Sequence, residues 1–335
     1  MIGPESIRLF RERCDAAAEA VIVTHMNPDG DAVGSAWSLA CFLRERGSRV
    51  RLVNQDPTPE YLEFIEPPER IEVYEASRHD ALLERADRVF LVDNSAPDRL
   101  GSMEPAMRRA ASRTLCIDHH PMRDAPWADT IVDVDSCATT AMIYDLATGC
   151  GWKPDLRSAW AIYLGLATDT GFFRFNSTNA RTHEIAAELL RLGVDSAWTY
   201  QQIYERNSPA YVRLLGHALA GLRLAAGGAV ASVLITTEMI RDVGAEDVDP
   251  TEITTSLLAM HGVRVALLFR ELGSGRVKVS LRSKGPLDVH RLATEFGGGG
   301  HRNASGIVMA GTADEAIRLV TARASALLDA SGDGA

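Results

Sequence analysis

The sequence predicts an α/β protein with a mostly parallel sheet, helices on both faces of that sheet, and a smaller α+β domain after it. Short β-branched apolar runs alternate with longer helical patterns through roughly the first 190 residues, as they do in parallel sheets. Beyond residue 222 the strand-like runs follow one another directly, with glycine-containing turns. At 335 residues the chain also exceeds the usual size of one hydrophobic core, which favours two domains.

The individual elements follow from apolar spacing. In the first part strands are expected at 20–24, 49–53, 88–92, 113–117 and 130–133, and helices at 32–46, 98–110, 138–148 and 155–168. Strands at 230–236, 263–270, 277–282 and 305–310 and a helix at 313–328 are expected later. Between them, a helical stretch interrupted at Ser208 and Pro209 predicts a connector. We therefore predict a catalytic domain at 1–192, a helical linker at 193–222 and a substrate-binding domain at 223–330.

Composition excludes several classes of protein. A net charge of −10 disfavours a long nucleic-acid duplex as ligand, because duplex affinity comes mainly from Lys and Arg at phosphates. A short nucleic acid is compatible with this charge. No stretch reaches the 18 apolar residues of a membrane span, and Glu5 and Arg8 occupy the place of a signal-peptide core. The five cysteines show no CxxC spacing. We expect a cytoplasmic protein without a membrane partner, and the sequence leaves a homodimer open.

The segment VIVTHMNPDGDAVGS joins an apolar strand to a helix and carries His25, Asp29 and Asp31. In an open α/β sheet, ligands bind beyond the carboxyl ends of the strands, which is where this loop lies. Two carboxylates so close together would repel each other unless a cation or strong donors lay between them. Imidazole and carboxylate ligands suit Mn²⁺, Mg²⁺ or Zn²⁺.

The same pattern recurs at two more strand ends and at one helix end. The run 89–92 ends in Asp93, the run 115–117 leads into Asp118-His119-His120, and the helical run in LGLATDTGFF presents Asp169. The candidate ligands are His25, Asp29, Asp31, Asp93, His119 and Asp169. Two imidazoles and four carboxylates are too many for one ion and fit a binuclear centre, which hydrolyses phosphate esters.

These motifs carry a family resemblance. HMNPDGDAVGS, VDNS, DHH and TDTGFF, in this order, resemble the four motifs of the DHH superfamily of phosphoesterases, and FGGGGHRNASG resembles the signature of the associated C-terminal domain. The resemblance implies two divalent ions, with Mn²⁺ preferred and Mg²⁺ as the alternative. It further implies that His25 and Asp29 bind one metal and Asp31 the other, that Asp93 bridges them, and that His119 and Asp169 complete the two sets.

The resemblance also assigns residues outside the metal set. His120 would face the scissile phosphate or protonate the leaving oxygen, and Asp118 would orient a histidine. In the C-terminal domain, segment 270–302 contains seven Lys or Arg residues and three acids. Successive glycines leave backbone N–H groups unshielded for a phosphate or ribose. The candidates for substrate binding there are Arg282, Ser283, Gly298, Gly299, Gly300, His301, Arg302 and Asn303.

The sequence therefore predicts a two-metal phosphoesterase in which a hydroxide between the metals attacks a short RNA, with the C-terminal domain holding its far end. Within the superfamily the pattern is most similar to bacterial bifunctional enzymes that degrade RNA of two to five nucleotides and dephosphorylate 3'-phosphoadenosine 5'-phosphate. The sequence does not distinguish hydrolysis of pApA from these two activities. A manganese pyrophosphatase and a catalytically silent nucleotide sensor are weaker alternatives, and a dinucleotide-binding dehydrogenase lacks its GxGxxG motif.

Overall fold

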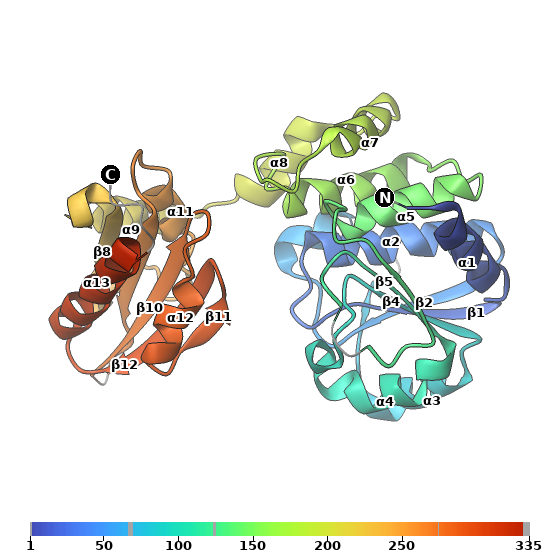
Figure 1. Cartoon of the computed structure of the whole chain (residues 1–335), viewed down its shortest axis with the longest axis horizontal. Helices are drawn as coiled ribbons and strands as arrows, with labels where there is room; N and C mark the ends of the chain where they lie inside the picture. Colours follow the sequence, from blue (N-terminus) through green and yellow to red (C-terminus); the bar gives the residue numbers. More distant parts are fainter. Residues whose placement is uncertain (1, 66–69, 123–124, 274, 331–335) are drawn as a thin grey trace. The chain divides into compact units, whose positions relative to one another are not determined.

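The computed structural model describes residues 2–65, 70–122, 125–273 and 275–330, and the chain divides into two compact units, Met1–Arg206 and Asn207–Ala335. The first unit contains a six-stranded sheet in the order β3-β2-β1-β4-β5-β6 (Figure 1). Its strands are β1 (Glu19–Val23), β2 (Arg49–Asn54), β3 (Glu72–Val73), β4 (Arg88–Val92), β5 (Thr114–Asp118) and β6 (Asp129–Val132). Every neighbouring pair is parallel. The carboxyl ends of the strands therefore share one edge, and the strand order reverses between β1 and β4.

Helices cover both faces of this sheet, which confirms the predicted parallel α/β class (Figure 1). On one face lie α1 (Pro4–Asp15), α2 (Gly30–Glu45), α5 (Thr139–Gly149) and α6 (Leu156–Asp169), and on the other lie α3 (Ala76–Arg85) and α4 (Glu104–Arg109). Alternate residues of β1 enter opposite cores, with Ile22 in the first and Val21 and Val23 in the second. Burial on both faces explains why the central strands β1, β4 and β5 are mostly apolar.

Every predicted strand and all but one of the predicted helices begin and end within two residues of an observed element. The exception is the single helix expected at 98–110. This segment instead forms a 3₁₀ helix, η2 (Pro97–Met103), followed by α4. Gly101 adopts φ 57° and ψ −135°, which no helix tolerates, and Pro105 starts a new helix in the first turn of α4. Six helices were not predicted: α1, α3 and α7 (Ala180–Arg191) in the first unit, and α10 (Thr237–Val243), α11 (Ile253–Leu258) and α12 (Val289–Glu295) in the described part of the second.

The second unit is built on a mixed sheet in the order β11-β12-β10-β9-β8-β7. Its strands are β7 (Arg223–Ala225), β8 (Val230–Ile235), β9 (Val265–Glu271), β10 (Arg276–Ser283), β11 (Gly299–His301) and β12 (Ala304–Ala310). The β8–β9 pair is parallel and the other pairs are antiparallel. The five helices that surround this sheet are α9 (Pro209–Ala220), α10 (Thr237–Val243), α11 (Ile253–Leu258), α12 (Val289–Glu295) and α13 (Ala313–Ala330). The smaller α+β domain was expected here.

The two helices of the predicted linker belong to different units. In α8 (Ser196–Tyr204), Trp198 packs edge-on against Phe64, with ring centroids 5.1 Å apart, inside the first unit. In α9, Leu214 and Ala218 lie in the core beneath β8 and β9 of the second unit. The division falls at Arg206 and Asn207, just before the N-cap residue Ser208 of α9.

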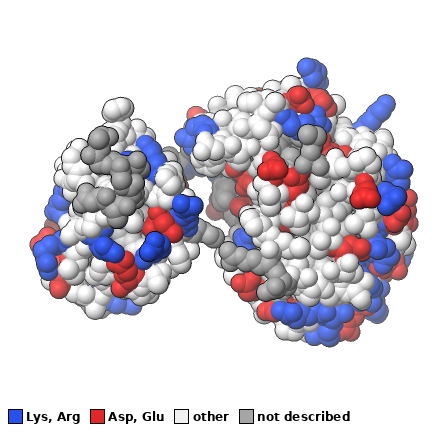
Figure 2. All heavy atoms as spheres, in the orientation of Figure 1, with Lys and Arg blue, Asp and Glu red and all other residues white. Residues whose placement is uncertain are grey.

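The surface carries mixed charge. On the face drawn in Figure 2, acidic and basic side chains are interspersed over both units. Many of them are paired, for example Arg51 with Glu72 and Arg181 with Asp145. Within the described residues, no helix is both long and apolar enough to cross a lipid bilayer.

Close packing of α2 against α6 depends on glycine. A Cβ atom on Gly34 of α2 would lie 2.4 Å from the backbone carbonyl oxygen of Ala161 in α6. A Cβ atom on Gly165 of α6 would lie 2.6 Å from Oδ1 of Asp31 in α2. Neither contact is sterically allowed. The two helices therefore approach each other closely only because both positions lack a side chain, and this approach brings Asp31 toward the end of α6.

We expect Gly34→Ala to reduce the free energy of unfolding by about 1–3 kcal/mol, because a backbone oxygen cannot rotate away from the added methyl group. Equilibrium urea unfolding measures this change. Gly216→Ala is the matched control, since it lies in α9 with nothing within 4 Å of the added Cβ. There, better helix propensity should raise stability by up to about 1 kcal/mol. Equal stability of Gly34→Ala and the wild type would contradict the tight crossing.

Candidate metal centre

The loop after β1 delivers the first two candidate ligands. His25 is 2% exposed, and its Nδ1 lies 2.8 Å from the carbonyl oxygen of Met26, which orients the ring. Asp29 is the N-cap of α2, where its Oδ1 accepts hydrogen bonds from the N–H groups of Asp31 and Ala32. Its other oxygen, Oδ2, lies 3.9 Å from His25 Nε2. One carboxylate thus starts the helix and also faces the histidine.

Neighbouring loops hold this loop in place. The N–H of Thr24 donates to Asn54 Oδ1, the N–H of Met26 donates to the carbonyl of Arg99, and the N–H of Asn27 donates to Asp56 Oδ2. Asn54 ends β2, Asp56 follows it and Arg99 lies in η2, so three sheet-edge segments are tied together. The conformation of the loop is therefore set by the protein itself.

Asp31 is fully buried in the first turn of α2 and is held by the N-terminus of α5. Its Oδ2 accepts from the N–H of Thr139 at 2.6 Å, and its Oδ1 accepts from the N–H and the hydroxyl of Thr140 at 2.9 and 2.7 Å. Free N–H groups at a helix N-terminus favour an anion. Thr139 and Thr140 were missed in the sequence. The two threonines that begin a predicted helix in CATT were the available signal.

Asp93, which follows β4, lies between the candidate histidines. Its Oδ2 is 3.4 Å from Nε2 of His25, and its Oδ1 is 3.7 Å from Nε2 of His119. Oδ1 also accepts a hydrogen bond of 3.0 Å from the hydroxyl of Thr139. The backbone of Asp93 has φ 59°, in the left-handed region that non-glycine residues seldom adopt. Asp93 is thus placed so that each carboxylate oxygen faces a different histidine.

Asp118, at the end of β5, and the two histidines that follow it make different contacts. His119 Nδ1 lies 3.2 Å from the carbonyl of Ser136, which leaves Nε2 directed at Asp169 Oδ2, 3.2 Å away. His120 Nδ1 lies 2.8 Å from Asp118 Oδ1 and 3.8 Å from Asp93 Oδ1. Asp118 is buried, whereas the side chain of His120 is 47% exposed. This contact agrees with the predicted orientation of a histidine by Asp118.

Together the six predicted ligands form two groups on one sheet edge. His25, Asp29 and Asp93 each offer a ligand atom within 4.8 Å of the others, and so do Asp31, His119 and Asp169. A third overlapping set is Asp93, His119 and His120. Asp169 reaches the site because it is the last residue of α6. The structure therefore brings together all six residues from four separate segments of the chain.

The electrostatics of the cluster call for cations. Burial and the nearby carboxylate of Asp31 raise the pKa of Asp93 well above its usual range, and the same causes raise the pKa of Asp169 to about 9. Burial lowers the pKa of His25, which favours the neutral ring that a metal requires. Nε2 of His25 and Nε2 of His119 are buried and make no hydrogen bond among the described residues. Divalent ions would satisfy both nitrogens and the crowded carboxylates.

His120 and Asp118 stabilise each other's charged forms. The hydrogen bond that His120 donates to Asp118 raises the pKa of His120, and burial opposes this only in part. Burial alone would raise the pKa of Asp118, but the hydrogen bonds from His120 lower it overall. His120 therefore keeps its proton to higher pH than an isolated histidine. Since Nδ1 is engaged by Asp118, Nε2 is the nitrogen that a ligand would meet.

The candidates of the second unit are arranged differently from the expected open loop. Gly299–His301 forms β11 and pairs with β12, and the N–H of Gly298 donates to the carbonyl of Ala293. The N–H of Gly298 is thus unavailable to a phosphate. A Cβ on Gly298 would meet the carbonyl oxygen of Gly306 at 2.2 Å, so this glycine is required by packing. Gly299 and Gly300 are exposed.

Polar side chains near this hairpin hold the turn after β10. The Asn303 amide donates to the carbonyls of Gly285 and Leu287 and to the Ser283 hydroxyl, which itself donates to the Leu287 carbonyl. Arg302 Nη2 donates to the carbonyl of Pro286. Three of the predicted substrate-binding side chains therefore have structural partners. Arg282 is half-buried in β10, and the side chain of His301 lies outside the described part of the structure.

A histidine and aspartate cluster at the point where a parallel sheet reverses its strand order, followed by an α+β unit, is the architecture of a metal-dependent phosphoesterase. Residues 19–168 match the DHH family, N-terminal domain, and residues 229–328 match the DHHA1 domain. The chain belongs to the DHH family of phosphoesterases, which are metal-dependent hydrolases.

Three comparisons describe its similarity to known proteins. The bifunctional oligoribonuclease and PAP phosphatase NrnA of Thermus thermophilus is 32% identical over 308 residues, or 92% of this chain and 89% of that protein. The protein of the same name from Bacillus subtilis is 29% identical over 85% of this chain and 88% of its own length. A crystal structure of an exopolyphosphatase-related protein from Bacteroides fragilis, 29% identical, superposes with a TM-score of 0.89 and covers 98% of this chain and 99% of that one.

We expect Thr140→Val to weaken Mn²⁺ binding by about 10- to 100-fold, because Asp31 loses a donor that fixes its orientation. Titration calorimetry measures this affinity. Thr148→Val is the matched control, since its hydroxyl donates only within α5, to the carbonyls of Tyr144 and Asp145. A Mn²⁺ affinity of Thr140→Val equal to that of the control would show that the hydroxyl does not support the site.

In the metal-free protein, Asp118→Asn should lower the pKa of His120. The negative partner that stabilises the imidazolium is lost, so the proton leaves at lower pH. NMR titration of the His120 ring between about pH 5 and about pH 9 measures the change. Asp155→Asn removes the same charge at the opposite end of α6 and should leave that titration as in the wild type. An unchanged titration in Asp118→Asn would contradict the pairing.

Proposed function

We propose that the protein hydrolyses RNA of two to five nucleotides to mononucleotides and 3'-phosphoadenosine 5'-phosphate to AMP, with two Mn²⁺ ions as cofactors and Mg²⁺ as the alternative. The names of the Thermus and Bacillus relatives support this substrate class. The observation that carries the proposal is the division of six side chains into two ligand groups with Asp93 facing both.

Each group supplies one histidine and two carboxylates. His25, Asp29 and Asp93 would hold one ion, and Asp31, His119 and Asp169 the other, with Asp93 shared. When bound, two such ions lower the pKa of water and neutralise charge on the phosphoryl oxygens. The hydrogen bonds that Nδ1 of His25 and Nδ1 of His119 donate to the carbonyls of Met26 and Ser136 keep the ligand nitrogens pointed at this position.

His120 would act on the substrate. Its Nδ1 is fixed by Asp118, so Nε2–H is presented from a ring that is 47% exposed at the edge of the cluster. A protonated Nε2 can donate a hydrogen bond to a phosphoryl oxygen and can give its proton to the departing ribose oxygen. Asp118 is a positioning residue, because it acts by holding the ring and by favouring the protonated form.

Short substrates suit the charge of the molecule. A net charge of −10 and interspersed surface charges offer little to an extended polyanion, so binding must come from a few local contacts (Figure 2). In the second unit we assign contacts with the substrate to Arg282, Gly299, Gly300 and His301, which are among the substrate-binding candidates from the sequence. The five cysteines are free, as is usual in a reducing compartment, and we place the activity in the cytoplasm.

A substrate panel tests the proposal. The purified protein is assayed on a dinucleotide, a pentanucleotide, a twenty-nucleotide RNA, 3'-phosphoadenosine 5'-phosphate, pApA and pyrophosphate, each with Mn²⁺ and with chelator. We expect metal-dependent turnover of the dinucleotide, pApA and the bisphosphate, and at least about 100-fold less activity in Asp93→Asn. Asparagine tolerates the left-handed backbone of position 93, so the fold is kept.

Several outcomes would contradict the proposal. Equal rates on the dinucleotide and the twenty-nucleotide RNA would exclude a preference for short RNA. Hydrolysis of pyrophosphate alone would assign the chain to a pyrophosphatase activity. Tight nucleotide binding without turnover under any metal would indicate a sensor. Asp98→Asn, a matched substitution of an exposed aspartate in η2, should keep wild-type turnover.

A further inference from the structure

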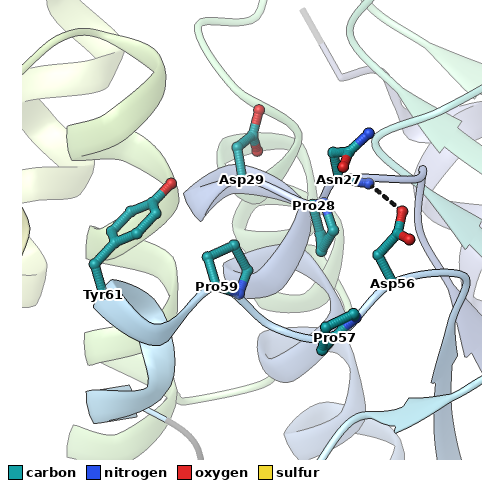
Figure 3. A pocket seen from close by; sticks show the side chains of 7 residues that line it. All are labelled: Asn27, Pro28, Asp29, Asp56, Pro57, Pro59 and Tyr61. Carbon is teal, nitrogen blue, oxygen red and sulfur yellow. Dashed lines mark hydrogen bonds between the residues drawn. The ribbon is translucent and has the colours of Figure 1, made fainter. Parts of the chain in front are cut away.

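A pocket of about 410 Å³ lies beside the metal centre in the first unit (Figure 3). The loop after β1 contributes one wall and the segment after β2, including the start of η1 (Glu60–Ile65), contributes the other. Its lining residues are Asn27, Pro28, Asp29, Asp56, Pro57, Pro59 and Tyr61. The volume is within the range of about 300–1,000 Å³ that small-molecule sites occupy.

Asp29 belongs to both the pocket and the metal centre. It lines the pocket, and it also belongs to the ligand group of His25 and Asp93. A phosphate held at the metals would therefore have its next covalently attached atoms at the mouth of this pocket. The pocket is adjacent to the reacting group, and its lining includes none of the residues predicted from the sequence to bind substrate.

The lining favours a flat, uncharged ring over a second phosphate. It contains two carboxylates and no Lys or Arg, so an anion would be repelled. Three prolines and the ring of Tyr61 give rigid apolar surface, and Tyr61 is 40% exposed. In Figure 3 Tyr61 and Pro59 face Asp29 and Pro28 across the pocket. An aromatic side chain can stack on any of the four bases, because every base has a π-face.

The walls are fixed before any ligand arrives. Leu62, next to Tyr61, is completely buried, and its N–H donates to the carbonyl of Pro59. Phe64 anchors the other end of η1 through its edge-on contact with Trp198. The two walls are joined where Asp56, on the same wall as Tyr61, accepts from the N–H of Asn27 on the other, the contact drawn in Figure 3. A rigid aromatic wall loses little entropy when a base stacks on it.

We propose that this pocket is a nucleobase subsite in which Tyr61 stacks on the base of one of the two nucleotides flanking the scissile phosphate. The inference rests on the proposed phosphoesterase function and adds a residue that selects for nucleotides. It explains how an acidic protein gains affinity for a dinucleotide without further cations. Pyrophosphate has no group to place in this pocket.

The test is a thermodynamic cycle that combines substitution of Tyr61 in the protein with removal of one base from the substrate. The values of kcat/KM are measured on a dinucleotide and on two analogues, each lacking one base, for the wild type, Tyr61→Phe and Tyr61→Ala. In the wild type, removal of one particular base should reduce kcat/KM by about 5- to 150-fold, the range for one stacked base. On the intact dinucleotide, Tyr61→Ala should reduce kcat/KM by a similar factor. On the analogue that lacks this base, the kcat/KM of Tyr61→Ala should equal that of the wild type. Tyr61→Phe should behave like the wild type.

Controls separate stacking from general damage. Tyr200→Ala removes a ring of similar exposure, 42%, that does not line the pocket, and it should retain the wild-type response to base removal. Thermal unfolding checks that each variant is folded. The subsite is overturned if Tyr61→Ala reduces kcat/KM by the same factor whether or not either base is present. It is also overturned if Tyr61→Ala and the wild type have equal kcat/KM on the intact dinucleotide.

The outcome is also separable from the proposed function. The same combinations are titrated by calorimetry with Ca²⁺ in place of Mn²⁺, which gives a binding readout that does not need turnover. Coupling between one base and Tyr61 in binding, without hydrolysis of any dinucleotide, would retain the subsite and reject the phosphoesterase proposal. Hydrolysis of the dinucleotide with no coupling in either measurement would retain the phosphoesterase and reject the subsite.

Discussion

The crowding of four carboxylates at one edge of a parallel sheet is the constraint on which the rest of this structure depends. Asp29, Asp31, Asp93 and Asp169 lie close together, with Asp31 and Asp93 buried, and burial and mutual repulsion raise the pKa of Asp93 and Asp169. Such a cluster is stable only if donors and cations compensate it. The N-terminal N–H groups of α2 and α5 supply part of that compensation. The remaining charge and the Nε2 atoms of His25 and His119, which make no hydrogen bond in the described part of the chain, define a place for divalent ions.

The fold brings the carboxylates together through the close approach of two helix backbones. Glycines at the crossing of α2 and α6 let the helices come close enough for Asp31 and Asp169 to meet, although the two residues are far apart in the chain. The reversal of strand order between β1 and β4 places His25 and Asp93 side by side. Helix packing and sheet topology therefore both bring the charged ligands together at one small region of the sheet edge. The pocket at Tyr61 extends this site with a surface that attracts rings and repels anions.

Strand ends were predictable from the sequence because apolar runs that stop at His or Asp mark them directly. The six candidate ligands followed from that pattern and from motif resemblance. Thr139 and Thr140 offered only the signal of two threonines near the start of a predicted helix, and the orienting carbonyls of Met26 and Ser136 offered none, because every residue has a backbone carbonyl. The glycine run 297–300 was expected as an open phosphate loop, yet cross-strand pairing made part of it a strand. The break at Gly101 depended on a backbone conformation that helical periodicity does not reveal.

Asp29 divides its two oxygens between different tasks, one for the start of α2 and one for the side of His25. Asp31 and both histidines are likewise tethered by the polypeptide. The coordination sphere is consequently shaped before a cation enters. Uptake of the ions then has little chain ordering to oppose it, so exchange between different divalent metals would change reactivity without remodelling the protein.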